Sequence, residues 1–301
     1  MAGASDAGTR RAQTAQRDQH ARRSHILLVA MLAILAYFML PLFWLLIAST
    51  KTTSDLFSTF GLWLADEVSL LGNVRETLTH DDGIYLVWIR NTLVYALVAA
   101  GGATALATLG GYGFAKFRFA GNRALTFIVL GAIAVPTTAL AIPTYLLFAR
   151  AGLVDTPWAV ILPSLVSPFG LFLMRVYTQT SVSDELIEAG RIDGAGEGRI
   201  FAQIALRTLA PGMITVLLFT LVATWNNYFL PLIMLHEPDI YPITVGLAQW
   251  SSQARGGSGS NPNLLALVTT GSLLSIIPLV AAFVILQRYW QSGLSAGSVK
   301  G

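Results

Sequence analysis

The segment "ILLVAMLAILAYFMLPLFWLLIA", residues Ile26–Ala48, contains no charged side chain. A helix that crosses the hydrocarbon core of a bilayer needs about 20 consecutive apolar residues, and this segment is long enough. A cleaved signal peptide has a shorter apolar core, followed by small residues at a cleavage site. Because the run is too long and no Ala-x-Ala site follows it, the segment predicts a retained transmembrane helix.

The rest of the chain repeats this pattern. Of its 301 residues, 54% are hydrophobic and only 12% are charged, whereas a soluble globular domain carries about 25% charged residues. We therefore predict an all-α integral membrane protein whose six transmembrane helices lie within residues 26–290. The shortest of the six uncharged stretches is the fourth, which contains Pro163 and Pro168. The stretches are Ile26–Ala48, Thr92–Ala115, Ala124–Ala149, Trp158–Met174, Gly212–Leu235 and Leu264–Gln287.

The distribution of basic residues predicts the orientation. Lysine and arginine concentrate in cytoplasmic loops, and most of the 19 basic residues share one side if the N-terminus is inside. With six spans, both termini are then cytoplasmic. Residues 1–25, rich in alanine, glutamine and arginine, are expected to form a disordered cytoplasmic tail. Residues 291–301 are expected to form the cytoplasmic C-terminal tail.

Several kinds of chemistry have no counterpart in the sequence. The absence of cysteine excludes disulfides and thiol chemistry. No phosphate-binding G-x-x-x-x-G-K loop and no nucleophile–base arrangement is present, so we expect a non-catalytic chain without a bound cofactor or nucleic acid. Gly110, Gly111 and Gly113 are expected to permit close helix packing instead. The four histidines are scattered and predict no metal site: His20, His25, His80 and His236.

Ionisable side chains are missing from all six stretches. Carriers driven by protons or ions commonly place such groups within the membrane, because a relay or a counter-ion is needed there. Their absence counts against a self-powered secondary carrier. That class stays open, because neutral oxygens can also hold sodium.

A polar stretch, "DELIEAGRIDGAGEGRI" (Asp184–Ile200), interrupts the apolar sequence. Ser183 is a candidate N-cap, and acidic residues follow it in the first turn, where the helix dipole favours them. The Asp193–Gly194 pair predicts a turn. A second short helix carries an apolar stripe, and Pro211 is expected to end it. The pattern predicts two short helices joined by a glycine turn, with the stripe made by Ile200, Phe201, Ile204 and Ala205.

The segment "EAGRIDGAGEGRIFAQIALRTLAP" (Glu188–Pro211) resembles the cytoplasmic EAA loop of ABC-importer permeases. It is most similar to the MalG-type subunit of bacterial carbohydrate importers. Similar segments elsewhere include "IRNTLVYA", "GYGFAKFRFAG" and "TWNNYFLPLIML". Gly190 stands where the family usually has alanine, and Arg207 where it usually has proline. The matching positions in the loop are Glu188, Ala189, Asp193, Gly194, Ala195, Phe201, Ile204, Leu206 and Pro211.

The resemblance implies a type I ABC importer permease in the bacterial inner membrane. A second, MalF-like permease, two ATPase subunits that bind ATP and magnesium, and an extracytoplasmic sugar-binding protein would be its partners. The substrate would be a di- or oligosaccharide, with a polyol or a glycerol phosphate as alternatives. The loop, residues 183–211, would couple to an ATPase subunit through Glu188, Ala189, Gly190, Asp193, Gly194, Ala195 and Phe201. In the family, the outer segment between the last two spans contacts the binding protein, which here suggests Tyr241, Gln249 and Trp250.

A sugar path needs hydrogen-bonding groups and aromatic faces in a pocket with few polar groups. Such residues cluster in the predicted fifth span at Trp225, Asn226, Asn227 and Tyr228, and in the third span at Thr137 and Thr138. The alternative for the fifth-span group is hydrogen bonding between helices together with an aromatic belt at the outer interface.

Overall fold

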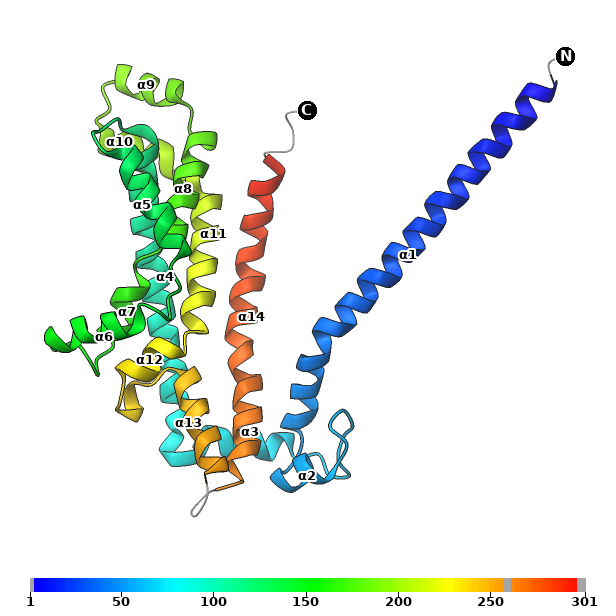
Figure 1. Ribbon diagram of the computed structural model, residues 1–301, viewed down its shortest axis with the longest axis vertical. Helices are drawn as coiled ribbons and strands as arrows, with labels where there is room; N and C mark the ends of the chain where they lie inside the picture. Colours follow the sequence, from blue (N-terminus) through cyan, green and yellow to red (C-terminus); the bar gives the residue numbers. More distant parts are fainter. Residues whose placement is uncertain (1–2, 257–260, 297–301) are drawn as a thin grey trace.

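The computed structural model describes the backbone of residues 3–256 and 261–296, and side chains within 26–256 and 261–289. These residues form helices and connecting turns, without a strand among them (Figure 1). In chain order the helices are α1 (Gly3–Ser49), α2 (Thr53–Ser58), α3 (Leu70–Thr79), η1 (His80–Gly83), α4 (Ile84–Lys116), α5 (Asn122–Ala134), α6 (Ala141–Arg150), α7 (Trp158–Ser164), α8 (Pro168–Ser181), α9 (Asp184–Ile192), α10 (Glu197–Ile200), η2 (Phe201–Ala205), α11 (Leu206–Trp225), α12 (Phe229–Met234), η3 (Pro238–Ile240), α13 (Ile243–Arg255) and α14 (Leu264–Ala296).

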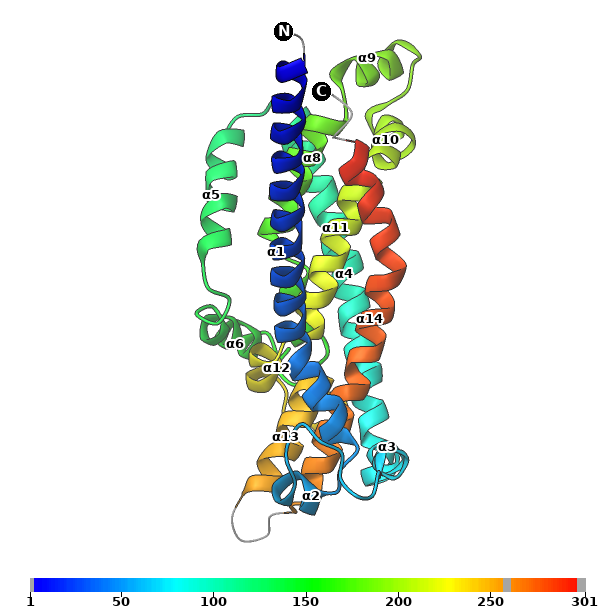
Figure 2. The same cartoon turned by 90° about the vertical axis from the view of Figure 1, so that its right-hand side faces the viewer.

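Helix α4 is the centre of the bundle and packs along α8 and α11 (Figures 1 and 2). Gly111 makes the contact with α8 possible, because a Cβ there would lie 2.6–2.7 Å from atoms of Met174 and Arg175. At Gly110 a Cβ would lie 3.1 Å from Leu171, whereas at Gly113 it would meet no atom within 4 Å. The close-packing prediction is therefore confirmed for Gly111 and Gly110 but is wrong for Gly113.

Within residues 3–256 and 261–296, five helical segments are long and apolar enough to cross a membrane, so the predicted count of six is not confirmed. The prediction of one continuous third span, Ala124–Ala149, is wrong, because α5 ends at Ala134. Val135 is extended, as expected before Pro136, whose ring disfavours the helical conformation of the preceding residue. The 13 residues of α5 span about 20 Å, less than the hydrocarbon core of about 30 Å.

The bounds of the fourth and fifth spans also differ from those predicted. The fourth runs over Trp158–Ser181, with a break after α7, and Pro168 begins α8 behind the N-cap Ser167. The fifth runs over Glu197–Trp225 rather than Gly212–Leu235. Its predicted last third lies instead in a turn and in the separate helix α12.

Helix α1 runs from Gly3 to Ser49, so residues 3–25 are helical where a disordered tail was expected. Alanine, glutamine and arginine are all good helix formers, which explains why the apolar helix extends backwards into them. The N-terminal end of α1, the C-terminal end of α14, and α9 with α10 lie at the same end of the molecule (Figures 1 and 2). Residues 297–301 of the predicted C-terminal tail lie outside the described residues.

Candidate functional site

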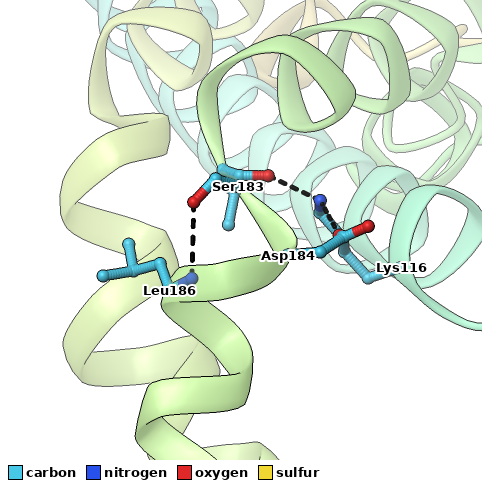
Figure 3. A network of polar contacts seen from close by, with 5 residues as sticks. Lys116, Ser183, Asp184 and Leu186 are labelled. Carbon is cyan, nitrogen blue, oxygen red and sulfur yellow. Dashed lines mark hydrogen bonds and ion pairs between the residues drawn. The ribbon is translucent and has the colours of Figure 1, made fainter.

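The polar stretch folds as two helices joined by a turn, as predicted, and we call residues 183–211 the loop. Ser183 caps α9, because its Oγ accepts a hydrogen bond from the Leu186 N–H at 3.3 Å (Figure 3). Asp184 and Glu185 occupy the first turn of α9, where carboxylates interact favourably with the helix dipole. The N-cap prediction is therefore confirmed.

Two glycines set the geometry of the turn. Gly194 has a φ of +75°, a conformation that side-chain-bearing residues rarely adopt, while a Cβ there would meet no atom within 4 Å. At Gly190 a Cβ would lie 3.1 Å from Ile204 and 3.2 Å from Ile200, so glycine brings α9 close to the second helix. Backbone conformation is the requirement at Gly194, and close approach is the requirement at Gly190.

The second arm of the loop continues directly into the membrane helix. The predicted break at Pro211 is wrong, because α10, the π-helical turn η2 and α11 follow one another without interruption to Trp225. Buried Leu209 precedes Pro211 by two residues and buried Gly212 follows it, and a Cβ at Gly212 would lie 2.8 Å from the Tyr177 ring. The second arm of the loop and α11 therefore form one continuous helical segment.

Apolar packing fixes the inner side of the loop. Ile187 of α9 and Ile200 of α10 are buried in one cluster with Tyr112 of α4 and Met174 of α8. Ala205 is also buried there, and Phe201 and Ile204 are partly buried against the same cluster, so the predicted stripe is confirmed. The Phe201 ring lies 4.9 Å from that of Tyr112, centroid to centroid. Phe201 thus contacts the bundle of its own chain.

A lysine that sequence reasoning missed ties the loop to α4. The Nζ of Lys116, the last residue of α4, donates a hydrogen bond to the Val182 carbonyl and another to the Asp184 carboxylate at 2.6 Å (Figure 3). The Lys116 hydrogen bond and positive charge hold the pKa of Asp184 below its ordinary value. Across the turn, Arg191 pairs with Glu197 at 2.7 Å, and this hydrogen bond raises the pKa of Arg191. Lys116 and Asp184 are 68 positions apart in the sequence, so no local pattern could indicate this contact.

The side of the loop that faces away from the helical bundle, which we call the outer side of the loop, is exposed to solvent. Glu188, Ala189, Asp193 and Gly194 are exposed, and Ala195 is half-buried. Ile192, which sequence reasoning did not single out, is 86% exposed.

The residues predicted to line a path occupy separate places. Trp225 is buried against Ala96 and Ala100 of α4. Asn226 is exposed at the end of α11, and its Nδ2 donates to the Val222 carbonyl at 2.9 Å. The backbone carbonyl of Asn227 accepts a hydrogen bond from Thr244, and Tyr228 is 41% exposed. Thr137 and Thr138 are exposed in the connection between α5 and α6, and no described hydrogen bond joins them to the α11 group.

At the opposite end of α4, side chains hold the outer segment, residues 236–255, through its backbone. Trp88 Nε1 donates to the Pro238 carbonyl at 2.9 Å, and Tyr95 Oη donates to the Ile240 carbonyl at 2.9 Å. Asn91 Nδ2 donates to the carbonyls of Asp239 and Tyr241 at 2.7 and 3.1 Å. Trp250, suggested above as an outward contact, is only 2% exposed, because it packs against Trp88 and Tyr85.

Comparison with known proteins shows which family and which solved structure this chain resembles. The family described as "Binding-protein-dependent transport system inner membrane component" matches residues 103–295. The arabinooligosaccharides transport system permease protein of Halalkalibacterium halodurans is 31% identical over 90% of this chain and 94% of its own length. The maltodextrin transport system permease protein of Bacillus subtilis is 34% identical over 73% of this chain and 78% of its own length. A bacterial ABC transporter involved in the import of the acidic polysaccharide alginate shares the fold, with a TM-score of 0.76 and 21% identity, over 89% of this chain and 97% of that one.

The described residues thus share the fold of a chain from a bacterial ABC transporter. The chain belongs to the family of binding-protein-dependent transport system inner membrane components. It is therefore a multi-pass protein of the inner membrane.

Proposed function

We propose that this chain is one of two permease subunits of an ATP-driven importer for a di- or oligosaccharide. A MalF-like permease would be the second, two ATPase subunits would dock on the cytoplasmic side, and an extracytoplasmic binding protein would deliver the sugar. The observation that carries the proposal is the loop: a rigid turn, exposed on one side, that continues without a break into α11.

The loop has the properties of a coupling element. Its outer side offers Glu188, Ala189, Asp193, Gly194 and the exposed Ile192 to an ATPase subunit. Its inner side is anchored by the apolar cluster and by Lys116. When ATP draws the ATPase subunits together, a push on the outer side would move α11, and α4 with it. ATP and magnesium would be bound by those partner subunits, and this chain would have no catalytic role.

The substrate class follows from the relatives. Their names specify arabinooligosaccharides, maltodextrin, lactose and raffinose-type sugars, which favours an oligosaccharide over a polyol or a glycerol phosphate. The group at Trp225–Tyr228 is our candidate for contact with the substrate or with the gate. Of these, Asn226 and Tyr228 are the exposed residues in this chain.

The test is Gly194→Val in the complex assembled with its ATPase subunits. A β-branched residue strains a backbone with a φ of +75°, where even a single left-handed residue costs roughly 1–2 kcal/mol. We expect the variant to assemble but to lose substrate-stimulated ATP hydrolysis and uptake.

Gly194→Asn is the matched control, because asparagine tolerates positive φ, and it should retain most activity. Full activity of Gly194→Val would show that the loop only connects two helices. Uptake that continues without ATP would instead support a secondary carrier.

A further inference from the structure

An open hollow of about 780 Å³ lies where the chain passes from α4 to α5. Phenylalanines form its apolar lining: Phe114, Phe117, Phe119 and Phe127. The rings of Phe114 and Phe119 meet edge to face at 5.7 Å. Asn122 fixes the connection, because its Nδ2 donates to the Phe114 carbonyl at 3.0 Å and closes the end of α4.

Two arginines, Arg118 and Arg123, line the same hollow and are exposed. Neither forms a salt bridge with another residue of the described chain. Arg118 is near enough to Asp184 to lower the pKa of that carboxyl, but the two are not in ion-pair contact, since Lys116 occupies the carboxylate. Arg123 lies over the Phe127 ring at 5.9 Å. The hollow therefore combines two available guanidinium groups with an aromatic wall.

The position of the hollow suits a lipid. The apolar span that contains α4 ends at Lys116, directly before it. Phe127, 61% exposed, lies within the apolar helix α5. The hollow thus runs from the charged end of the α4 span along the first turns of an apolar helix, a position that suits a lipid headgroup and the start of its acyl chains. Arginine is well suited to a phosphate diester, which it binds with two parallel hydrogen bonds.

We propose that this hollow binds an anionic phospholipid of the cytoplasmic leaflet. Arg118 and Arg123 bind the phosphate, and the phenylalanines contact the upper part of the acyl chains. Which leaflet supplies the lipid rests on the proposed function, which places this end of α4 in the cytoplasm. The binding itself does not depend on transport.

The experiment titrates the purified full-length chain in a neutral detergent with a short-chain phosphatidylglycerol and follows binding by native mass spectrometry. We expect saturable binding of one phosphatidylglycerol and much weaker binding of phosphatidylcholine of the same chain length. The double variant Arg118→Gln/Arg123→Gln should bind at least tenfold more weakly, because each basic residue near an anionic lipid contributes roughly a fivefold change in affinity.

Arg207→Gln is the matched control, because Arg207 is exposed at the same end of the molecule but lies outside the hollow. It should leave phosphatidylglycerol binding unchanged. Arg123→Lys, which retains the positive charge, should bind more tightly than Arg123→Gln, and this comparison shows that a loss reflects charge rather than misfolding.

Three results would overturn the proposal. Wild type and the double variant could bind equally well, or Arg207→Gln could weaken binding as much as the double variant. Free glycerol 3-phosphate could also displace the lipid at equal concentration, which would identify a phosphate site rather than a lipid site. Loss of uptake in any loop variant, by contrast, has no bearing on this result.

Discussion

The two ends of α4 differ in the hydrogen bonds that hold them to the rest of the chain. At the outer end, Trp88, Asn91 and Tyr95 donate four hydrogen bonds to backbone carbonyls between Pro238 and Tyr241. At the inner end, Lys116 is the one described side chain of α4 that is bonded to the loop, and apolar contacts make up the rest. The outer end is packed in an apolar cluster as well, which includes Tyr85, Trp88 and Trp250, so the two ends differ in their hydrogen bonds.

The difference indicates how each attachment would be lost. Several neutral hydrogen bonds would have to break together to release the outer segment from α4. The loop is attached to α4 by the apolar cluster and by the hydrogen bond from Lys116 to Asp184.

The largest effect is expected from a substitution that disrupts the packing of the outer segment on α4. A Cβ at Gly246 of α13 would lie 2.2 Å from ring atoms of Trp88, so Gly246→Ala should destabilise the protein by about 3 kcal/mol through overpacking. Thermal unfolding followed by tryptophan fluorescence measures this. Gly113→Ala in α4 has no neighbour within 4 Å of the new methyl and should stabilise slightly, by at most about 1 kcal/mol. Equal midpoints for the two variants would contradict the packing argument.

The second effect removes hydrogen bonds without adding volume. Asn91→Ala leaves two carbonyls of the outer segment without a donor, which should cost about 2 kcal/mol of unfolding free energy. Tyr95→Phe removes a single bond to the Ile240 carbonyl and should cost about 1 kcal/mol. Thermal unfolding compares the two variants. If the outer segment is held through its backbone, Asn91→Ala should lower the unfolding midpoint more than Tyr95→Phe, and the reverse order would contradict this.

A smaller effect is expected when the contact between Lys116 and Asp184 is tested by varying the pH. Because the folded-state pKa of Asp184 is lowered, its contribution to stability is fully present above the ordinary value of 3.8 and is lost as pH falls through the folded value. The difference in unfolding midpoint between wild type and Asp184→Asn should therefore be small at neutral pH and vanish in strong acid. Glu185→Gln, in the same helical turn, is the control, because no described hydrogen bond or salt bridge joins Glu185 to Lys116. If the midpoints of wild type and Asp184→Asn differed by the same amount at every pH, the contact between Asp184 and Lys116 would not be the cause of that difference.

The least perturbing experiment determines on which side of the membrane each end of α4 lies. The chain has no native cysteine, so single cysteines at Ser252 of the outer segment and at Gly196 of the loop can be labelled cleanly. An impermeant maleimide added to intact cells should modify Ser252→Cys and not Gly196→Cys, with little change in activity. The reverse pattern would invert the proposed orientation.

Much of the loop could be predicted from local sequence. Ser183 caps the helix that it precedes, and Gly194 permits a left-handed turn, because both effects act within a few residues. The continuity across Pro211 was not predicted, because proline usually ends or kinks a helix, whereas here it lies inside α11. The broken third span was missed although Pro136 was visible, because hydropathy does not register a backbone break.

The sequence by itself determined that this chain lies in a membrane and that it is helical. It also determined that a polar segment, made of a capped helix and a glycine turn, interrupts the apolar spans. Those properties depend on composition and on neighbours along the chain. Only the tertiary structure decided that Lys116 meets Asp184, that Asn91 holds the outer segment, and that Trp250 is buried rather than exposed. These contacts join residues far apart in sequence, and they form only when helices pack at a particular distance and register.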